Sequence, residues 1–86
     1  MLGMDLDFHF DNLAKHNVST DEVEEALADS NGWTQKARGG AYLHLGKTEQ
    51  GRLLELAFRR LPDGSAFIFH AMDARDSQKK RYKKRS

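Results

Sequence analysis

The segment from His70 to Ser86, HAMDARDSQKKRYKKRS, gathers the side chains best suited to chemistry on a charged substrate. His70 is a candidate general acid or base, because an imidazole gains and loses a proton near neutral pH. Arg75 could bind a phosphate through two parallel hydrogen bonds, and Tyr82 could stack on a base or position a proton. Each also has a structural interpretation: a hydrogen-bonded core histidine, an ion pair with a neighbouring aspartate, and a tyrosine that packs a helix onto a sheet.

The same segment carries a dense set of basic residues. These cations would attract phosphates regardless of sequence, with a steep dependence on salt. The alternative is a solvated helix end, since cations also stabilise the C-terminus of a helix. The set consists of Lys79, Lys80, Arg81, Lys83, Lys84 and Arg85.

The net charge of +1 hides an uneven distribution of charge along the chain. Residues 1–35 contain eight acids and one base, whereas residues 36–86 contain thirteen bases and five acids. If the fold keeps the two halves on different faces, one face is strongly basic and attracts polyanions. Uneven charge of this kind also arises by chance in small proteins.

Composition excludes several kinds of site. The chain has no cysteine, so disulfides and thiolate metal sites are impossible. Its four histidines lack the spacing of metal ligands, and no glycine-rich loop could hold a phosphate, so neither a metal nor a cofactor is expected. No apolar run is long enough to span a membrane, and the first residues do not resemble a signal peptide. A cytoplasmic protein without membrane contact is expected.

Apolar periodicity and turn residues predict an α+β protein of one domain, residues 1–86, with a flexible basic tail at about 83–86. A short N-terminal strand and two helices precede a three- or four-stranded antiparallel sheet, and a basic helix follows it. The expected strands lie at 5–11, 33–37, 41–46, 52–60 and 66–72, and the expected helices at 11–17, 20–29 and 74–84.

The second of these helices has the clearest start signal. Ser19 and Glu22 have the spacing of a capping box, and Val18 and Val23 have the positions of a hydrophobic staple around it. Asn17, which precedes them, suits a left-handed residue at the end of the first helix.

Alternation within the strands predicts which side chains face the core. In the strand at 52–60, Leu54, Leu56 and Phe58 are expected to face it. In the strand at 66–72, the expected faces are Ile68, His70 and Met72 on one side, and Phe67, Phe69 and Ala71 on the other. In the helix at 74–84, Arg75, Lys79 and Tyr82 are expected on one side. His44 is expected to be exposed beside Tyr42.

Several stretches occur in an order found in a known family. F-x-F-D at 8–11 is followed by NLAKHNVSTDEVEEAL at 12–27. Tyr42-Leu43 then precedes Gly46-Lys47-Thr48, and LLELAFRR and HAMDARDSQKKRY follow. Over about residues 8–82 the chain resembles the BrnT-type toxins, members of the RelE-like superfamily of bacterial toxin–antitoxin systems.

The resemblance implies a RelE-like fold and a metal-independent endoribonuclease that cuts mRNA and is neutralised by a cognate antitoxin, with which it forms a hetero-oligomer. Such a reaction needs a base for the ribose 2′-hydroxyl, an acid for the 5′-oxygen and cations for the phosphate. The expected catalytic residues are His70, Arg75 and Tyr82. The residues expected to bind RNA are Lys15 and His16, the family's KH pair, together with Lys79, Lys80, Arg81 and Lys83.

The chain also departs from the family's pattern. Phe10 stands where the family has tryptophan, and Asn17 stands for glycine. His70-Ala71-Met72 stands where S/T-A-R is common, so Met72 replaces an arginine often held to contact RNA. The alternative is therefore a catalytically weak or inactive module that binds RNA or an antitoxin on the same fold.

Overall fold

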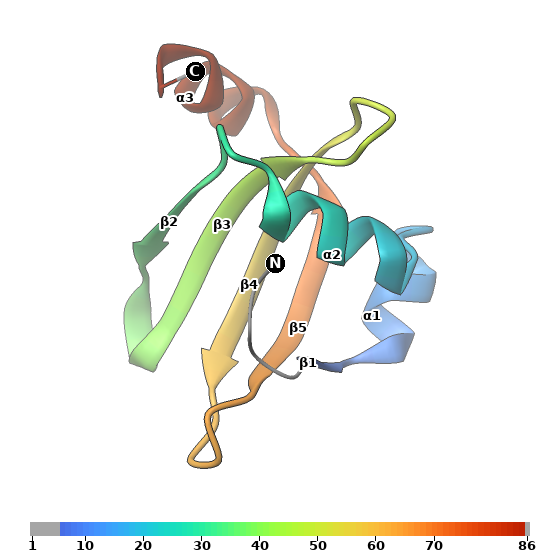
Figure 1. The fold of residues 1–86 in the computed structure, drawn as a ribbon, viewed down its shortest axis with the longest axis vertical. Coiled ribbons are helices and arrows are strands. Elements are labelled where there is room, and N and C mark those ends of the chain that lie inside the picture. Colours follow the sequence, from blue (N-terminus) through green and yellow to red (C-terminus); the bar gives the residue numbers. More distant parts are fainter. Residues whose placement is uncertain (1–5, 86) are drawn as a thin grey trace.

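A computed structural model describes residues 6–85 of the chain, without the side chain of Arg85 (Figure 1). A five-stranded sheet in the order β1-β5-β4-β3-β2 is flanked by three α-helices. The strands are β1 (Leu6–Phe8), β2 (Trp33–Lys36), β3 (Ala41–Lys47), β4 (Leu53–Arg60) and β5 (Ala66–Asp73). The α-helices are α1 (Phe10–Lys15), α2 (Thr20–Ala28) and α3 (Asp76–Arg85), and a short 3-10 turn, η1, spans Arg38–Gly40.

The α+β class and the order of the elements are confirmed, but the expected number of sheet strands was too low. Strand β1 joins the sheet by pairing in parallel with β5, with Leu6 opposite Ala66 and Phe8 opposite Ile68. Apolar alternation predicts that a strand exists but not which strand it pairs with. The expected strand at 5–11 ends early because α1 begins at Phe10, and Asp5 lies outside the described residues. Residues 83–85 of the tail that was expected to be flexible belong to α3, and Ser86 lies outside the described residues.

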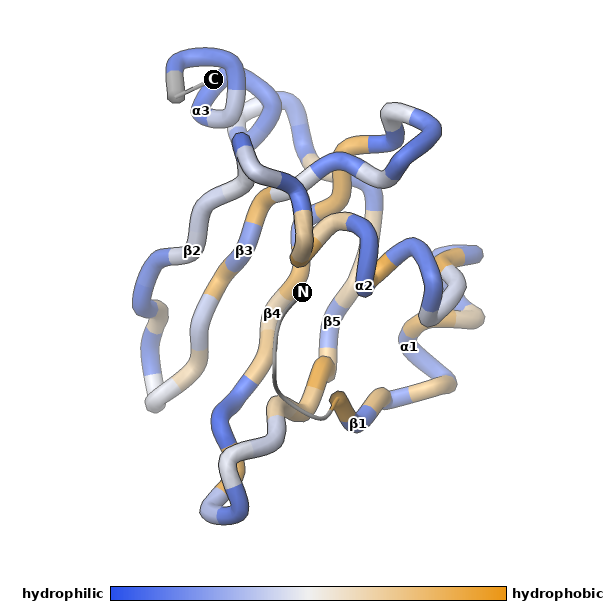
Figure 2. Tube along the Cα trace, in the orientation of Figure 1, coloured by the Kyte–Doolittle hydropathy of each residue, from blue (hydrophilic) through white to orange (hydrophobic). Residues whose placement is uncertain are grey.

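The main core lies between one face of the sheet and the helices α1 and α2. Figure 2 shows the apolar residues concentrated in the central strands, whereas α3 is hydrophilic over most of its length. The prediction for β4 is confirmed, because Leu54 and Leu56 are fully buried and Phe58 is 5% exposed. The core cluster is completed by Leu13, Val18, Val23, Ala26, Ala66, Ile68 and Ala71.

The start of α2 follows the sequence prediction. The hydroxyl of Ser19 accepts from the Glu22 backbone N–H at 3.1 Å, and the Glu22 carboxylate accepts from the Ser19 N–H at 3.0 Å. Val18 and Val23 are both buried. Asn17 has a φ of 54°, the left-handed conformation expected at the end of α1. The local signals therefore fix the turn between the two helices.

The predicted faces of β5 are wrong beyond Ile68, because the strand contains a β-bulge. Ala57 of β4 pairs with His70, whereas the next residue, Phe58, pairs with Ile68, so Phe69 is an extra residue in β5. An extra residue reverses the alternation of side chains that follow it. Ile68 and Ala71 consequently share the core face, and His70 shares the opposite face with Ala57. We call that opposite face, which carries Leu43, Glu55, Ala57 and His70, the open face.

Helix α3 packs over one end of the open face through a narrow stripe. Gln78 and Tyr82 of α3 are 7% and 4% exposed, and Ala74, two residues before the helix, is 4% exposed. The expectation that Tyr82 shares a side with Arg75 and Lys79 is wrong, since both of those residues are exposed. Ala74 and Tyr82 belong to a second apolar cluster with Leu45, Trp33 and Leu53.

His44 is buried, which corrects the prediction that it is exposed beside Tyr42. The side chain is 5% exposed; its Nδ1 lies 2.7 Å from Thr34 Oγ1 and its Nε2 lies 2.8 Å from the Ala26 carbonyl oxygen. Because a carbonyl can only accept, Nε2 carries the proton and Nδ1 accepts from the hydroxyl. His44 is buried because α2 packs closely on β3. The packing is so close that a Cβ on Gly46 of β3 would collide with the backbone of Ala26 in α2.

Mild acid should destabilise the fold through His44. Burial lowers the pKa of this imidazole below its ordinary value of 6.5, so the folded protein keeps it neutral where the unfolded chain takes a proton. The contribution of neutral His44 to the free energy of unfolding is therefore present above about pH 6.5. It falls by up to about 1 kcal/mol as the pH drops to about 5.5. Urea unfolding at the two pH values measures this loss. His44→Gln should show a smaller loss, and equal losses would contradict the prediction.

Candidate functional site

A buried carboxylate brings two of the predicted site residues together on the open face. Glu55, in the middle of β4, is 2% exposed. Its Oε1 accepts from the Arg75 backbone N–H at 3.0 Å and from Arg75 Nε at 3.1 Å. Its Oε2 lies 3.5 Å from His70 Nε2. Glu55 therefore holds an imidazole and a guanidinium that are both partly open to solvent.

The bulge in β5 makes this arrangement possible. Without it, alternation from Ile68 would direct His70 into the apolar core. With Phe69 as the extra residue, His70 points to the same face as Glu55. Glu55 was not among the predicted site residues, although an acid between the apolar pairs of LLELAF is unusual enough to have indicated a polar role.

His16 lies next to this cluster. The His16 and His70 rings are edge to face, with centres 6.1 Å apart. Helix α1, which ends just before His16, is attached to the edge of β5 because the Asn12 side-chain oxygen accepts from the Ala71 N–H at 3.0 Å. We refer to His16, Glu55, His70 and Arg75 together as the Glu55 cluster.

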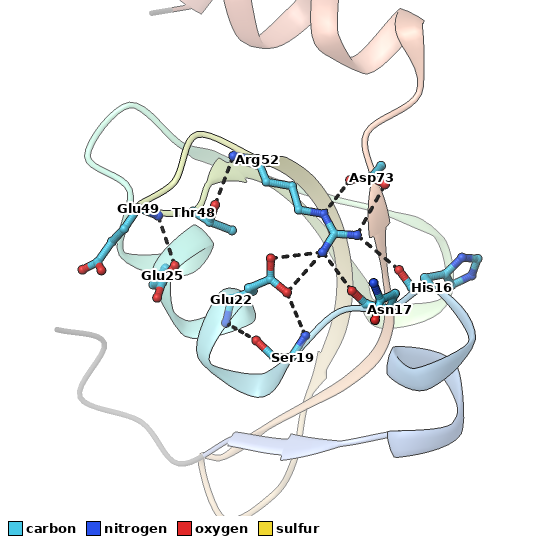
Figure 3. Close-up of polar contacts among 9 residues, drawn as sticks. All are labelled: His16, Asn17, Ser19, Glu22, Glu25, Thr48, Glu49, Arg52 and Asp73. Carbon is cyan, nitrogen blue, oxygen red and sulfur yellow. Dashed lines mark hydrogen bonds and ion pairs between the residues drawn. The ribbon is translucent and has the colours of Figure 1, made fainter.

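Arg52 fixes the position of the loop that carries His16, as Figure 3 shows. Its guanidinium donates to the carbonyl oxygens of His16 at 3.2 Å and Asn17 at 2.9 Å. The same group pairs with Glu22 at 3.0 Å and with Asp73 at 2.7 Å. One side chain, from the residue just before β4, thus joins the α1–α2 loop, the start of α2 and the end of β5.

The charges around Arg52 stabilise one another. A hydrogen bond from Arg52 is the main cause that lowers the pKa of Asp73 below its ordinary value. Hydrogen bonds from the Ser19 backbone and from Arg52 also lower the pKa of Glu22. Both carboxylates therefore stay ionised to a lower pH than they would in the unfolded chain, so their pairing with Arg52 is lost only as the pH falls through the lowered pKa values.

Tyr82 contributes to packing, which was the alternative to its expected catalytic role. Its hydroxyl donates to Asp29 Oδ2 at 2.6 Å, and Lys47 Nζ lies 5.4 Å from the centre of its ring. Burial and the bond to Asp29 raise the pKa of Tyr82 to about 12. The hydroxyl thus fastens α3 to the end of α2, and no contact joins it to the Glu55 cluster in the described part of the chain.

The basic residues expected to bind RNA lie in three places. Lys15 is exposed at the end of α1, close in sequence to His16. Arg81 contacts Trp33 and Gln35 at the β2 edge of the sheet. The others are exposed along α3: Lys79, whose Nζ lies 3.9 Å from Asp76, Lys80 and Lys83. The structure thus gathers His16, His70 and Arg75, whereas α1, which carries Lys15, lies apart from α3 (Figure 1).

Within residues 6–85, no group of three or more His, Cys, Asp or Glu side chains has an arrangement that could hold a metal ion. No helix in this part of the chain is long and apolar enough to cross a membrane. The chemistry available at the Glu55 cluster is that of two imidazoles, a carboxylate and a guanidinium. Such a set can transfer protons and stabilise negative charge on a phosphate.

A comparison with solved structures tests the fold expected from the sequence. The helix pair, the sheet and the basic C-terminal helix form the arrangement expected for a RelE-like α+β protein. The chain superposes on the crystal structure of the Brucella abortus ribonuclease toxin BrnT with a TM-score of 0.67 and 14% identity, over 85% of this chain and 99% of that one. The chain therefore has the fold of a BrnT-type toxin. No protein-family model matches the sequence, and no curated protein does either.

Replacing Arg52 should destabilise the protein more than replacing another surface arginine. Arg52→Met removes the donor for two backbone carbonyls and leaves the Glu22 carboxylate without its guanidinium partner. We expect a loss of about 2–3 kcal/mol in the free energy of unfolding, measured with urea. Arg60→Met is the matched control, because Arg60 is exposed at the far end of β4. Equal midpoints for the two variants would show that the Arg52 contacts do not stabilise the fold.

Proposed function

We propose that the protein is an endoribonuclease that cuts mRNA without a metal ion. The observation that carries this proposal is the convergence of His70 and Arg75 on the buried carboxylate of Glu55, with the His16 ring beside them. These groups supply a proton acceptor, a proton donor and a cation at one solvent-accessible place. The likeness to a ribonuclease toxin supports the same reading.

In the proposed reaction, His70 accepts the proton of a ribose 2′-hydroxyl, and the 2′-oxygen attacks the adjacent phosphorus. The bond from phosphorus to the 5′-oxygen breaks, and His16 donates a proton to that oxygen. The products are a 2′,3′-cyclic phosphate and a free 5′-hydroxyl. Glu55 orients His70 and stabilises its protonated form, and Arg75 stabilises the charge that builds on the phosphate oxygens.

Met72 keeps a second proposal open. This residue pairs with Glu55 across the strands, where the family's pattern has an arginine. Arg75 places a guanidinium on the same carboxylate from three residues further along, so the cation is supplied from a different position. If that replacement is insufficient, the chain is a catalytically weak or inactive module that binds RNA or an antitoxin.

We further propose that the chain acts as one domain in the cytoplasm, as the toxin of a type II toxin–antitoxin pair. The exposed cations of α3 would bind RNA backbone, and an antitoxin protein would form a hetero-oligomer with the toxin and prevent that binding. Charge complementarity of this kind mainly speeds association and selects the partner.

Purified protein should cut single-stranded RNA in a buffer containing EDTA. His70→Ala should reduce the cleavage rate by about 100-fold or more, because general acid–base catalysis contributes on the order of that factor or more. Arg75→Ala should reduce it by about 100-fold through loss of charge stabilisation. A gel assay with end-labelled RNA measures both rates.

Arg60→Ala serves as the matched arginine control and should keep the wild-type rate. An RNA with deoxyribose at the cleaved position should resist cutting, because it lacks the attacking hydroxyl. RNA binding without any cleavage by the wild-type protein would reject the nuclease and leave the binding module.

Expression in a bacterial host without an antitoxin should arrest growth and deplete mRNA. His70→Ala, expressed to the same level, should allow growth, since the toxicity is attributed to RNA cleavage. Colony counts and northern blots after induction measure the two effects. Normal growth at high expression of wild-type protein would contradict a toxin function, and equal arrest by His70→Ala would assign the toxicity to something other than cleavage.

A further inference from the structure

A second group of solvent-accessible side chains lies across the sheet from the Glu55 cluster. Trp33, Gln35, Arg81 and Lys84 line a shallow hollow of about 330 Å³ between β2 and α3. The guanidinium carbon of Arg81 lies 4.9 Å from the centre of the Trp33 ring. Arg81 Nη2 also donates to Gln35 Oε1 at 2.8 Å. A guanidinium held over an indole in this way is a preformed surface for stacking.

The sheet connects this hollow directly to His70. Residues opposite one another on neighbouring strands share a face, and Gln35 pairs with Leu43, Leu43 with Ala57, and Ala57 with His70. These four side chains therefore form one row across the open face. With strands about 4.8 Å apart, the row is about 14 Å long. Its two central side chains are apolar and half-buried, so the row has polar groups only at its ends.

We propose that the hollow binds a nucleobase of single-stranded RNA, a few nucleotides from the bond held at the Glu55 cluster. The base stacks on the Arg81 guanidinium over Trp33, as bases commonly do on arginine planes and aromatic rings. Lys84 pairs with the adjacent phosphate. Arg81 holds the oxygen of the Gln35 amide, so the NH2 of that amide is directed to the edge of the base.

The mixture of groups in the hollow favours RNA over an acidic protein segment. Carboxylates would pair with Arg81 and Lys84, but they would gain little from a flat indole and guanidinium surface. A nucleotide uses both parts, since its phosphate pairs with the cations and its base stacks. The apolar side chains of Leu43 and Ala57 give the intervening nucleotides a surface along which to pass toward His70. The inference extends the proposed ribonuclease function and names a binding subsite for it.

The chain offers a direct probe of this subsite, because Trp33 is its only tryptophan. Wild-type protein is titrated at physiological salt with an oligomer of about eight nucleotides, long enough to cross the sheet. Its riboses are 2′-O-methylated, so that binding is measured without cleavage. We expect quenching of the tryptophan emission and a saturable binding curve.

Arg81→Met should weaken binding of this oligomer by at least about fivefold and reduce the quenching, because one stacked base contributes at least that factor. Arg60→Met is the matched control, because it also removes one arginine charge, but at the end of β4 beside the β4–β5 hairpin. The control should bind within about twofold of the wild type, because distant exposed charges are screened. Both arginines are exposed, so neither change should unfold the protein.

Three results would overturn the subsite: binding without any change in Trp33 emission, equal weakening by Arg81→Met and Arg60→Met, or the same quenching with polyglutamate of matched charge. The outcome is independent of the cleavage assay. Binding with quenching but no cleavage of natural RNA rejects the nuclease and retains the subsite. If the wild-type protein shows no quenching and Arg81→Met cleaves RNA at the wild-type rate, the nuclease is retained and the subsite is rejected.

Discussion

The guanidinium of Arg52 is the interaction on which the geometry of this small protein depends. It joins the α1–α2 loop, the first turn of α2 and the end of β5, three segments that are far apart in sequence (Figure 3). The backbone carbonyl of His16 is one of its acceptors, so the position of that imidazole beside His70 follows from this contact. A domain of this size has a small core, and a multidentate arginine supplies order that apolar packing alone would not.

The sheet divides the molecule into two faces with different tasks. One face is covered by α1 and α2, and it holds most of the apolar core. Of the described helices, α3 covers one end of the other face (Figure 1), and Leu43, Ala57 and His70 on that face are partly exposed. The acids of α2 and the bases of α3 lie over these separate parts, so the uneven charge of the sequence becomes an uneven charge in space.

The predictable parts of the structure were those governed by neighbouring residues. The capping box of Ser19 and Glu22 and the left-handed Asn17 formed as expected, because each depends on a few adjacent residues. The parts not predicted depend on distant segments. His44 is buried because α2 packs over β3, and β1 extends the sheet because it finds the edge of β5. The local pattern of apolar residues predicts neither of these contacts.

The sequence alone determined the α+β class, the order of the elements, the basic C-terminal helix and the choice of His70 and Arg75 as chemical candidates. Only the tertiary structure decided that these two residues meet. One extra residue in β5, Phe69, reverses the direction of His70, and Glu55 then links it to Arg75. The bulge lies in the pairing of β5 with β4, and Asn12 of α1 accepts from the backbone of β5 one residue beyond His70. Alternation along a single strand contains no information about either.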